Sequence, residues 1–120
     1  MVNAAEKLLP QALRTKLIEN HTVNLASRML DGSVTDFQPV VKLFVCVGGA
    51  ATWLLTELDP KTNVFFGLCD LGHGFPEIGY VSQVDFDTLH GRLERDLYFN
   101  ATHDLSWYAQ EARNHRYIAA

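Results

Sequence analysis

Three carboxylates in the middle of the sequence have the residue types and spacing for chemistry. Glu57, Asp70 and Glu77 lie on or beside successive apolar stretches, so their side chains could converge on one side of a sheet. Hard cations such as Mg²⁺ and Ca²⁺ prefer clustered oxygen ligands, and one hypothesis is therefore a small metal-assisted hydrolase or ligand-binding domain. The alternative, which we prefer, is that each carboxylate caps a turn or pairs with a base such as Arg95.

A second group of charges is the run Glu94-Arg95-Asp96. A buried Arg95 could hold Glu77 or Asp70 through its planar guanidinium, and we expect this structural role rather than a substrate-binding one. Adjacent residues of a strand point to opposite faces, so Arg95 and Asp96 cannot serve one site directly. The candidate binding residues are thus Glu57, Asp70, Glu77, Arg95 and Asp96; we assign no catalytic or metal-ligating residue.

Cys69 and His73 offer a thiol and a base a few residues apart. A nucleophile needs its base within hydrogen-bond reach, but this histidine lies in a glycine-rich loop without an identifiable orienting partner, so we expect no catalysis here. Cys46 and Cys69 are expected to be small buried hydrophobes, and their spacing fits no zinc signature. The sequence predicts no cofactor.

The composition excludes several classes of protein. The chain is 48% hydrophobic and 20% charged with a net charge of −4, which is typical of one globular domain, here residues 1–120. No basic patch is present, so direct nucleic-acid binding is not expected. No run approaches the ~20 apolar residues of a membrane helix, and the beginning lacks the pattern of a secretory signal. We therefore expect a cytoplasmic protein; its oligomeric state stays open.

The elements that must position these residues begin with a predicted hairpin. Residues 51–58 and 64–70 are rich in β-branched, aromatic and aliphatic side chains and are separated by the turn sequence Asp59–Asn63, which favours antiparallel pairing. The glycine-rich stretch 72–76 then predicts a sharp connection into a short strand over 77–81. A further apolar strand is predicted over 40–47.

Helices are predicted at three places around this sheet. Leu9, Leu13 and Leu17 form one apolar stripe of a helix over 5–19, whereas residues 20–38 have the composition of a loop or variable insert with at most a helical turn near 25–30. Ser82 with Asp85 predicts a capping box for a middle helix that extends to Leu89. A last helix follows Thr102 or Asp104, and 94–99 is a plausible edge strand. The predicted fold is α+β: a four- to five-stranded antiparallel meander packed by N-terminal, middle and C-terminal helices.

Five aromatic side chains of the stretch 53–80 are expected to belong to the core: Trp53, Phe65, Phe66, Phe75 and Tyr80. Joint exposure of Phe75 and Trp107 would instead indicate a surface for a partner.

Several motifs carry a resemblance to a known family, and they occur in a fixed order: Trp53–Pro60 (WLLTELDP), Phe66–Gly72 (FGLCDLG), Pro76–Tyr80 (PEIGY) and Glu94–Phe99 (ERDLYF). With Leu8-Leu9-Pro10 and Pro39–Phe44 they resemble a family of short bacterial proteins of unknown function, often encoded on plasmids and other mobile elements. The resemblance implies a mobile-element accessory protein. It supplies no reaction and no catalytic residue.

The function we expect is a non-enzymatic protein-binding module whose acidic central face meets another protein. Residues 51–84 hold four carboxylates against Lys61 alone. The resemblance suggests a partner in plasmid maintenance or anti-defence. The metal-assisted hydrolase or ligand-binding domain remains the competing hypothesis.

Overall fold

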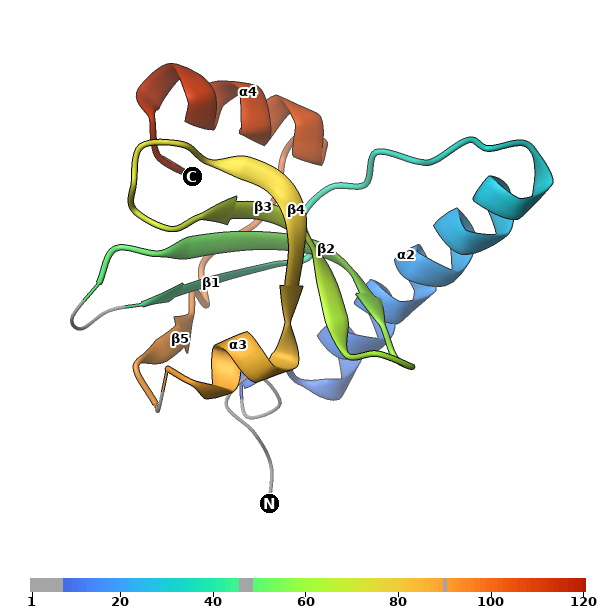
Figure 1. Ribbon diagram of the computed structural model, residues 1–120, viewed down its shortest axis with the longest axis horizontal. Helices are drawn as coiled ribbons and strands as arrows, with labels where there is room; N and C mark the ends of the chain where they lie inside the picture. Colours follow the sequence, from blue (N-terminus) through green and yellow to red (C-terminus); the bar gives the residue numbers. More distant parts are fainter. Residues whose placement is uncertain (1–7, 46–48, 90) are drawn as a thin grey trace.

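The computed structural model describes residues 8–45, 49–89 and 91–120, and a five-stranded antiparallel sheet forms its centre (Figure 1). In chain order the elements are α2 (Gln11–Leu30), β1 (Val41–Val45), β2 (Thr52–Asp59), β3 (Val64–Asp70), β4 (Glu77–Ser82), α3 (Gln83–Asp87), β5 (Leu93–Arg95) and α4 (Leu105–His115). The strand order is β4-β3-β2-β1-β5, and every neighbouring pair is antiparallel. The predicted α+β fold with a meander sheet is confirmed. The predicted strand residues 46–47 and helix residues 5–7 lie outside the described part.

The predicted hairpin is present and organises the sheet. Trp53 pairs with Cys69 and Leu54 with Leu68 in an antiparallel register. Asp59 closes the turn in two ways: its carbonyl accepts the N–H of Asn63 at 2.9 Å, and its carboxylate accepts the N–H of Lys61 at 2.9 Å. Asn63 adopts a positive φ of 56°, a conformation that asparagine tolerates better than most residues.

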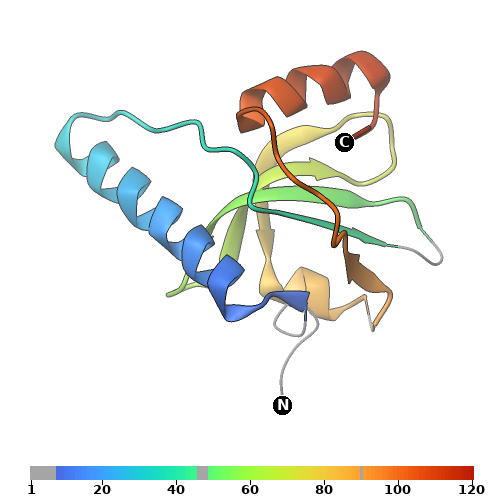
Figure 2. The same cartoon turned by 180° about the vertical axis from the view of Figure 1, so that it is seen from behind.

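The two faces of the sheet carry separate cores. On the first face, Trp53, Leu55 and Phe65 pack with Leu17 of α2 and Phe86 of α3; we call this the α2 face. On the other, the α4 face, side chains of β2 and β3 pack against α4 (Figures 1 and 2). The α4-face cluster consists of Leu54, Leu68, Leu105, Tyr108, Ala109 and Ala112. Alternation of side chains along the strands explains why neighbours such as Trp53 and Leu54 serve different cores.

A β-bulge interrupts β2 in front of Glu57. Leu55 pairs with Gly67 and Glu57 with Phe66, so Thr56 is the extra residue of β2. A bulge bends its strand and redirects the side chains that follow. Glu57 consequently shares a face with Phe66, which packs against the α4-face cluster.

Helix α2 is longer than predicted, and the expected loop over residues 20–38 is wrong in its first part. The helix continues to Leu30, because two asparagines that resemble turn residues in the sequence are buried and bonded. Asn20 Nδ2 donates to the Thr56 carbonyl at 3.0 Å, and Asn24 also bonds to groups outside the helix. Tertiary hydrogen bonds at the bulge thus outweigh the weak helix preference of asparagine. The segment after α2 runs back past the beginning of α4 to β1 (Figure 2).

Two further elements are shorter than predicted. The edge strand β5 spans Leu93–Arg95 instead of 94–99, because the Asp96 carboxylate accepts the Tyr98 N–H at 2.9 Å and turns the chain. The predicted Ser82–Asp85 capping box is present, but α3 ends at Asp87.

Candidate functional site

The three candidate carboxylates do not converge, which contradicts the geometry required by the hydrolase hypothesis. Asp70 pairs with Thr52 and Glu57 with Phe66, so these two acids lie near opposite ends of the β2–β3 ladder. Glu77 lies opposite Cys69 and therefore on the other face from Asp70. Within the described ranges, no three histidine, cysteine, aspartate or glutamate side chains are grouped to hold a metal ion.

Asp70 has a structural role different from the expected ion pair. Its side chain is 3% exposed, and its two carboxylate oxygens accept the N–H of Gly72 and the N–H of Ile118, each at 2.9 Å. The first bond shapes the β3–β4 connection, and the second attaches the segment after α4 to the sheet. Two charge-assisted bonds to backbone N–H groups replace the guanidinium that the sequence suggested.

Arg95 cannot reach Glu77 or Asp70, so the predicted ion pair is wrong. β5 pairs with β1 at one edge of the sheet, whereas β4 lies at the opposite edge. The half-buried Arg95 instead donates from Nε to the Leu8 carbonyl at 2.7 Å. It therefore fixes the chain ahead of α2 rather than an acidic site.

Asp96 belongs to a local charge pair. Its Oδ2 lies 3.4 Å from Lys42 Nζ. The N–H of Tyr98 is the main cause that holds the pKa of Asp96 below its usual value, desolvation opposes this, and Lys42 lowers the pKa further. Lys42 also donates to the Ala120 carbonyl. Asp96 thus organises this edge of the sheet. Contrary to the prediction, Arg95 and Asp96 both line one open cleft here, because β5 ends at Arg95 and strand alternation does not separate the two side chains.

Burial raises the pKa of the Cys69 thiol to about 11. At neutral pH the side chain is therefore a thiol, which is a poor nucleophile. His73 is exposed on the connection after β3, and no bond between the two residues is formed among the described side chains.

We expect alkylation of Cys69 by iodoacetamide to be slow at pH 7 and to rise about tenfold per pH unit up to about pH 11, because only the thiolate reacts. The measurement is the alkylation rate, by mass spectrometry, of a Cys46→Ser protein, in which Cys69 is the remaining cysteine. A plateau already at pH 8–9 would contradict the raised pKa.

Two aromatic side chains predicted to be core residues are exposed. Trp53 and Phe65 are buried as expected, but Phe75 is 74% and Tyr80 69% exposed. The Tyr80 ring contacts the neighbouring ring of Phe66, with ring centroids 5.1 Å apart. The sequence pattern of β4 resembles a core strand, whereas its position at the edge of the sheet leaves Tyr80 uncovered. Phe75 lies in the connection before β4.

Trp107 is also partly exposed, at 42%, on α4. Its ring stacks on the ring of His103 and meets the ring of Tyr108 edge-on. No ring contact within the described part joins it to Phe75, so the two exposed rings are not shown to form one surface.

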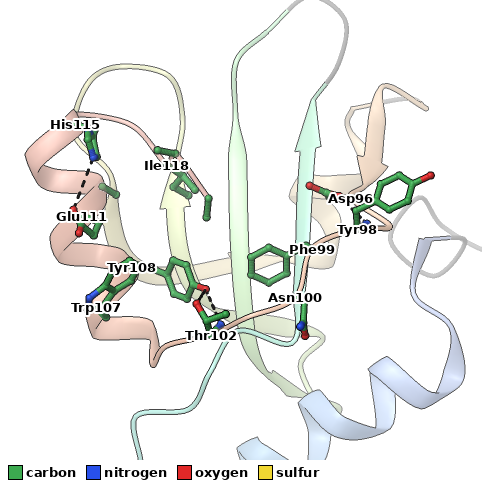
Figure 3. A pocket seen from close by; sticks show the side chains of 13 residues that line it. Asp96, Tyr98, Phe99, Asn100, Thr102, Trp107, Tyr108, Glu111, His115 and Ile118 are labelled. Atoms are coloured by element: carbon green, nitrogen blue, oxygen red, sulfur yellow. Dashed lines mark hydrogen bonds and ion pairs between the residues drawn. The ribbon is translucent and has the colours of Figure 1, made fainter.

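A cleft of about 500 Å³ lies between α4, residues 96–102 and residues 118–120. Figure 3 shows Phe99 and Tyr108 in its middle, with Glu111 and His115 on one side and Asp96 on the other. Two polar contacts join residues of its lining: the Tyr108 hydroxyl accepts the Thr102 N–H at 2.9 Å, and His115 lies 3.8 Å from Glu111. The acid and base of this cleft, Glu111 and His115, form an exposed i,i+4 pair on one turn of α4, which is common on helix surfaces.

β4 has a free backbone edge whose hydrogen-bonding groups can be identified. The N–H of Gln83 bonds to the carbonyl of Asn63 at 2.9 Å, so this pair is hydrogen-bonded at the end of the β3–β4 ladder. Hydrogen-bonded and non-hydrogen-bonded pairs alternate along an antiparallel ladder. Residues 77, 79 and 81 therefore bond to β3, and the N–H and C=O groups of Ile78 and Tyr80 point away from it.

Ser82, the next residue of the outward series, agrees with this direction. Its N–H is taken by the Asp85 carboxylate at 3.1 Å as part of the capping box. No described group bonds to the outward backbone groups of Ile78 or Tyr80. Two residues of β4 thus present unpaired donors and acceptors beside exposed apolar side chains.

A second, smaller cleft of about 250 Å³ opens above Glu57; we call it the Glu57 cleft. It is bounded by α2, the segment after α2, the bulge of β2, strands β3 and β4, and the first turn of α4, and its lining includes Asn24, Arg28, Glu57, Phe66, Ile78 and Leu105. Glu57 was a candidate from the sequence, whereas Asn24 was not. Asn24 follows Leu17 and Asn20 on one buried stripe of α2, and this polar interruption of an apolar stripe is the pattern that could have identified it.

Comparison with known proteins identifies one family. The family described as "Protein of unknown function (DUF2958)" matches residues 8–119, which confirms the resemblance to a family without an assigned function. Comparisons with curated proteins and with solved structures returned no significant match. In the described ranges, no helix has the length and apolar character needed to cross a membrane.

Proposed function

Because the chain belongs to the DUF2958 family, whose description names no activity, we propose from its structure that it is a non-enzymatic protein-binding module. In this proposal an extended segment of a partner protein pairs with the free edge of β4. The main support for this proposal is that the backbone N–H and C=O groups of Ile78 and Tyr80 point away from the sheet, beside the exposed side chains of the same two residues.

An exposed strand edge favours pairing with another chain. Natural proteins commonly protect such edges with lysine, proline, a very short strand or a covering element. β4 has six residues without lysine or proline, and its one charged residue, Glu77, is the first of them. Ile78 and Tyr80, further along, are 37% and 69% exposed. An added strand would gain main-chain hydrogen bonds and would contact these two side chains, which is how strand addition provides affinity and specificity.

The other edge of the sheet is protected in the ways that β4 is not. β5 has only three residues, and the chain then turns at Asp96, whose N–H bonds to the Lys42 carbonyl at 3.0 Å. The contrast between the two edges supports β4 as the binding edge. The resemblance to mobile-element proteins suggests plasmid-maintenance and anti-defence systems as the first places to look for the partner.

The test is selection of random linear peptides displayed on phage against the wild-type chain and against Tyr80→Lys. We expect the wild type to enrich peptides with alternating apolar residues, and Tyr80→Lys to weaken their binding by about tenfold or more, a loss of about 1.4 kcal/mol. Amide hydrogen exchange at Ile78 and Tyr80 should slow when a selected peptide binds, because these N–H groups become bonded.

Val84→Lys is the matched control. Val84 is 68% exposed on the adjoining helix α3, and the substitution adds the same charge away from the β4 edge. It should bind selected peptides as the wild type does. Equal loss in both variants would mean that charge rather than the β4 edge governs binding. Unchanged exchange at Ile78 and Tyr80 in a saturated complex would refute strand addition.

A further inference from the structure

Glu57 is a deeply buried carboxylate with a sparse set of partners. Its side chain is 4% exposed, and Asn24 Nδ2 donates to Oε2 at 3.0 Å. No second hydrogen bond to the carboxylate and no ion pair with it is formed in the described part of the chain. A carboxylate has about four acceptor sites on its two oxygens, so one amide donor leaves most of its hydrogen-bonding capacity unused.

The side-chain amide of Asn24 is held in place by hydrogen bonds to groups other than Glu57. Its Oδ1 accepts the Thr35 N–H at 2.7 Å, and its Nδ2 also donates to the Thr35 carbonyl at 3.1 Å. The amide is therefore fixed by both backbone groups of one residue. Oε1 of Glu57 has no hydrogen-bond partner among the described groups, and Glu57 lines the Glu57 cleft.

The other charges that line the Glu57 cleft do not compensate this carboxylate. Asp36 is a second acid, and it accepts the N–H and the hydroxyl of Ser106 in the first turn of α4. Arg28 is a cation of the lining, but it is exposed and not within ion-pair distance of Glu57. The cleft thus offers at its base a carboxylate that forms no ion pair within the described part of the chain.

The remaining lining selects the kind of cation that fits. Phe66, Ile78 and Leu105 provide apolar and aromatic surface, on which a guanidinium stacks and packs better than an ammonium because it is planar and more weakly hydrated. The volume of about 250 Å³ is below the ~300–1,000 Å³ of typical small-molecule sites, which suits one side chain. We propose that the Glu57 cleft receives an arginine side chain of the partner protein, whose guanidinium pairs with the Glu57 carboxylate.

The source of this arginine rests on the proposed function, because Ile78 belongs both to the free edge of β4 and to the lining of the cleft. A partner segment bound along β4 would therefore pass beside the cleft. The chemistry of the cleft itself depends only on Glu57 and its surroundings and can be tested without a partner.

The test uses N-acetyl-arginine methylamide as a probe, titrated into the whole ¹⁵N-labelled chain and followed by ¹H–¹⁵N NMR. We expect saturable shifts of the Asn24 side-chain amide and of the Thr35 backbone amide, which report on the Glu57 environment. N-acetyl-citrulline methylamide, the neutral analogue of nearly the same shape, should bind about tenfold more weakly or not at all, since it lacks the charge.

Glu57→Gln keeps the shape of the side chain and an acceptor for Asn24, and it should weaken binding of the arginine probe by about tenfold or more. Glu77→Gln is the matched control, because Glu77 is an exposed carboxylate of β4 outside the cleft; it should bind as the wild type does. Should Glu57→Gln fail to fold, the comparison of the arginine and citrulline probes on the wild type still tests whether the cleft binds a guanidinium.

Equal binding of the two probes, unchanged binding by a folded Glu57→Gln, or the absence of saturable shifts would each overturn the proposal. Strong energetic coupling between Arg28→Ala and Glu57→Gln in a double-mutant cycle would also overturn it, since Arg28 would then occupy the cleft from within. Tyr80→Lys separates the two proposals. It should weaken peptide binding at β4 by about tenfold or more and leave probe binding intact, so that either proposal can fail alone.

Discussion

Replacing Trp53 with alanine should lower the free energy of unfolding by about 3–5 kcal/mol, as large aromatic deletions in cores do. The side chain is only 5% exposed, and its ring meets the ring of Phe86 edge-on with centroids 5.1 Å apart. Its loss would open a cavity between β2 and α3 on the α2 face. Urea denaturation of the wild type and the variant measures the difference.

Trp107→Ala is the matched control, because Trp107 is 42% exposed and stacks on His103 at the surface, with centroids 3.7 Å apart. We expect it to cost about 0.5–1.5 kcal/mol, the range of an aromatic pair. Equal midpoints for Trp53→Ala and the wild type would show that the Trp53 ring contributes no core packing.

The strands could be predicted because each apolar run is bounded by unambiguous turn residues. Asp59, Pro60 and Asn63 leave little choice but a hairpin, and the Ser82–Asp85 capping box fixes where β4 gives way to α3. These are local properties of the chain, and local physics determined them. The exposure of Tyr80 is not local, because it depends on which strand forms the edge.

The predicted ion pair of Arg95 was wrong for the same reason, because it also depended on the order of the strands. A meander places consecutive strands side by side, and a fifth strand following this rule would have lain near β4. The chain instead crosses back to pair β5 with β1, which places Arg95 at the opposite edge from Glu77. The order of strands in the sheet depends on how the two cores are filled. It cannot be predicted from the spacing of the strands along the sequence.

The Glu57 cleft could be predicted only in part. Glu57 was recognised as a candidate, but its environment depends on the bulge at Thr56 and on Asn24 more than thirty residues earlier. Asn20 and Asn24 read as loop residues by propensity, although their spacing continues the stripe begun by Leu17. The helical periodicity of residues 17, 20 and 24 predicts this part of the helix better than the propensity of asparagine does. A buried asparagine in a helix implies a polar partner on the facing element.

The neighbouring glycines of β3 and β4 should respond in opposite ways to the same methyl group. A Cβ added at Gly67 would lie 2.1 Å from the Leu54 carbonyl oxygen and 2.8 Å from the Leu55 Cα. Both are backbone atoms of β2 that cannot rotate away. We therefore expect Gly67→Ala to lower the free energy of unfolding by about 3 kcal/mol or more, at or above the upper end for overpacked cores.

Gly79 lies directly opposite Gly67 in the β3–β4 ladder, and a Cβ added there meets nothing within 4 Å. Gly79→Ala should leave stability unchanged or raise it by about 0.5–1 kcal/mol, because alanine loses less chain entropy than glycine on folding. Urea midpoints of the two variants, with equal slopes, measure the contrast. Similar midpoints would mean that β2 and β3 can separate at the bulge, and the close backbone approach that positions Glu57 would then not be rigid.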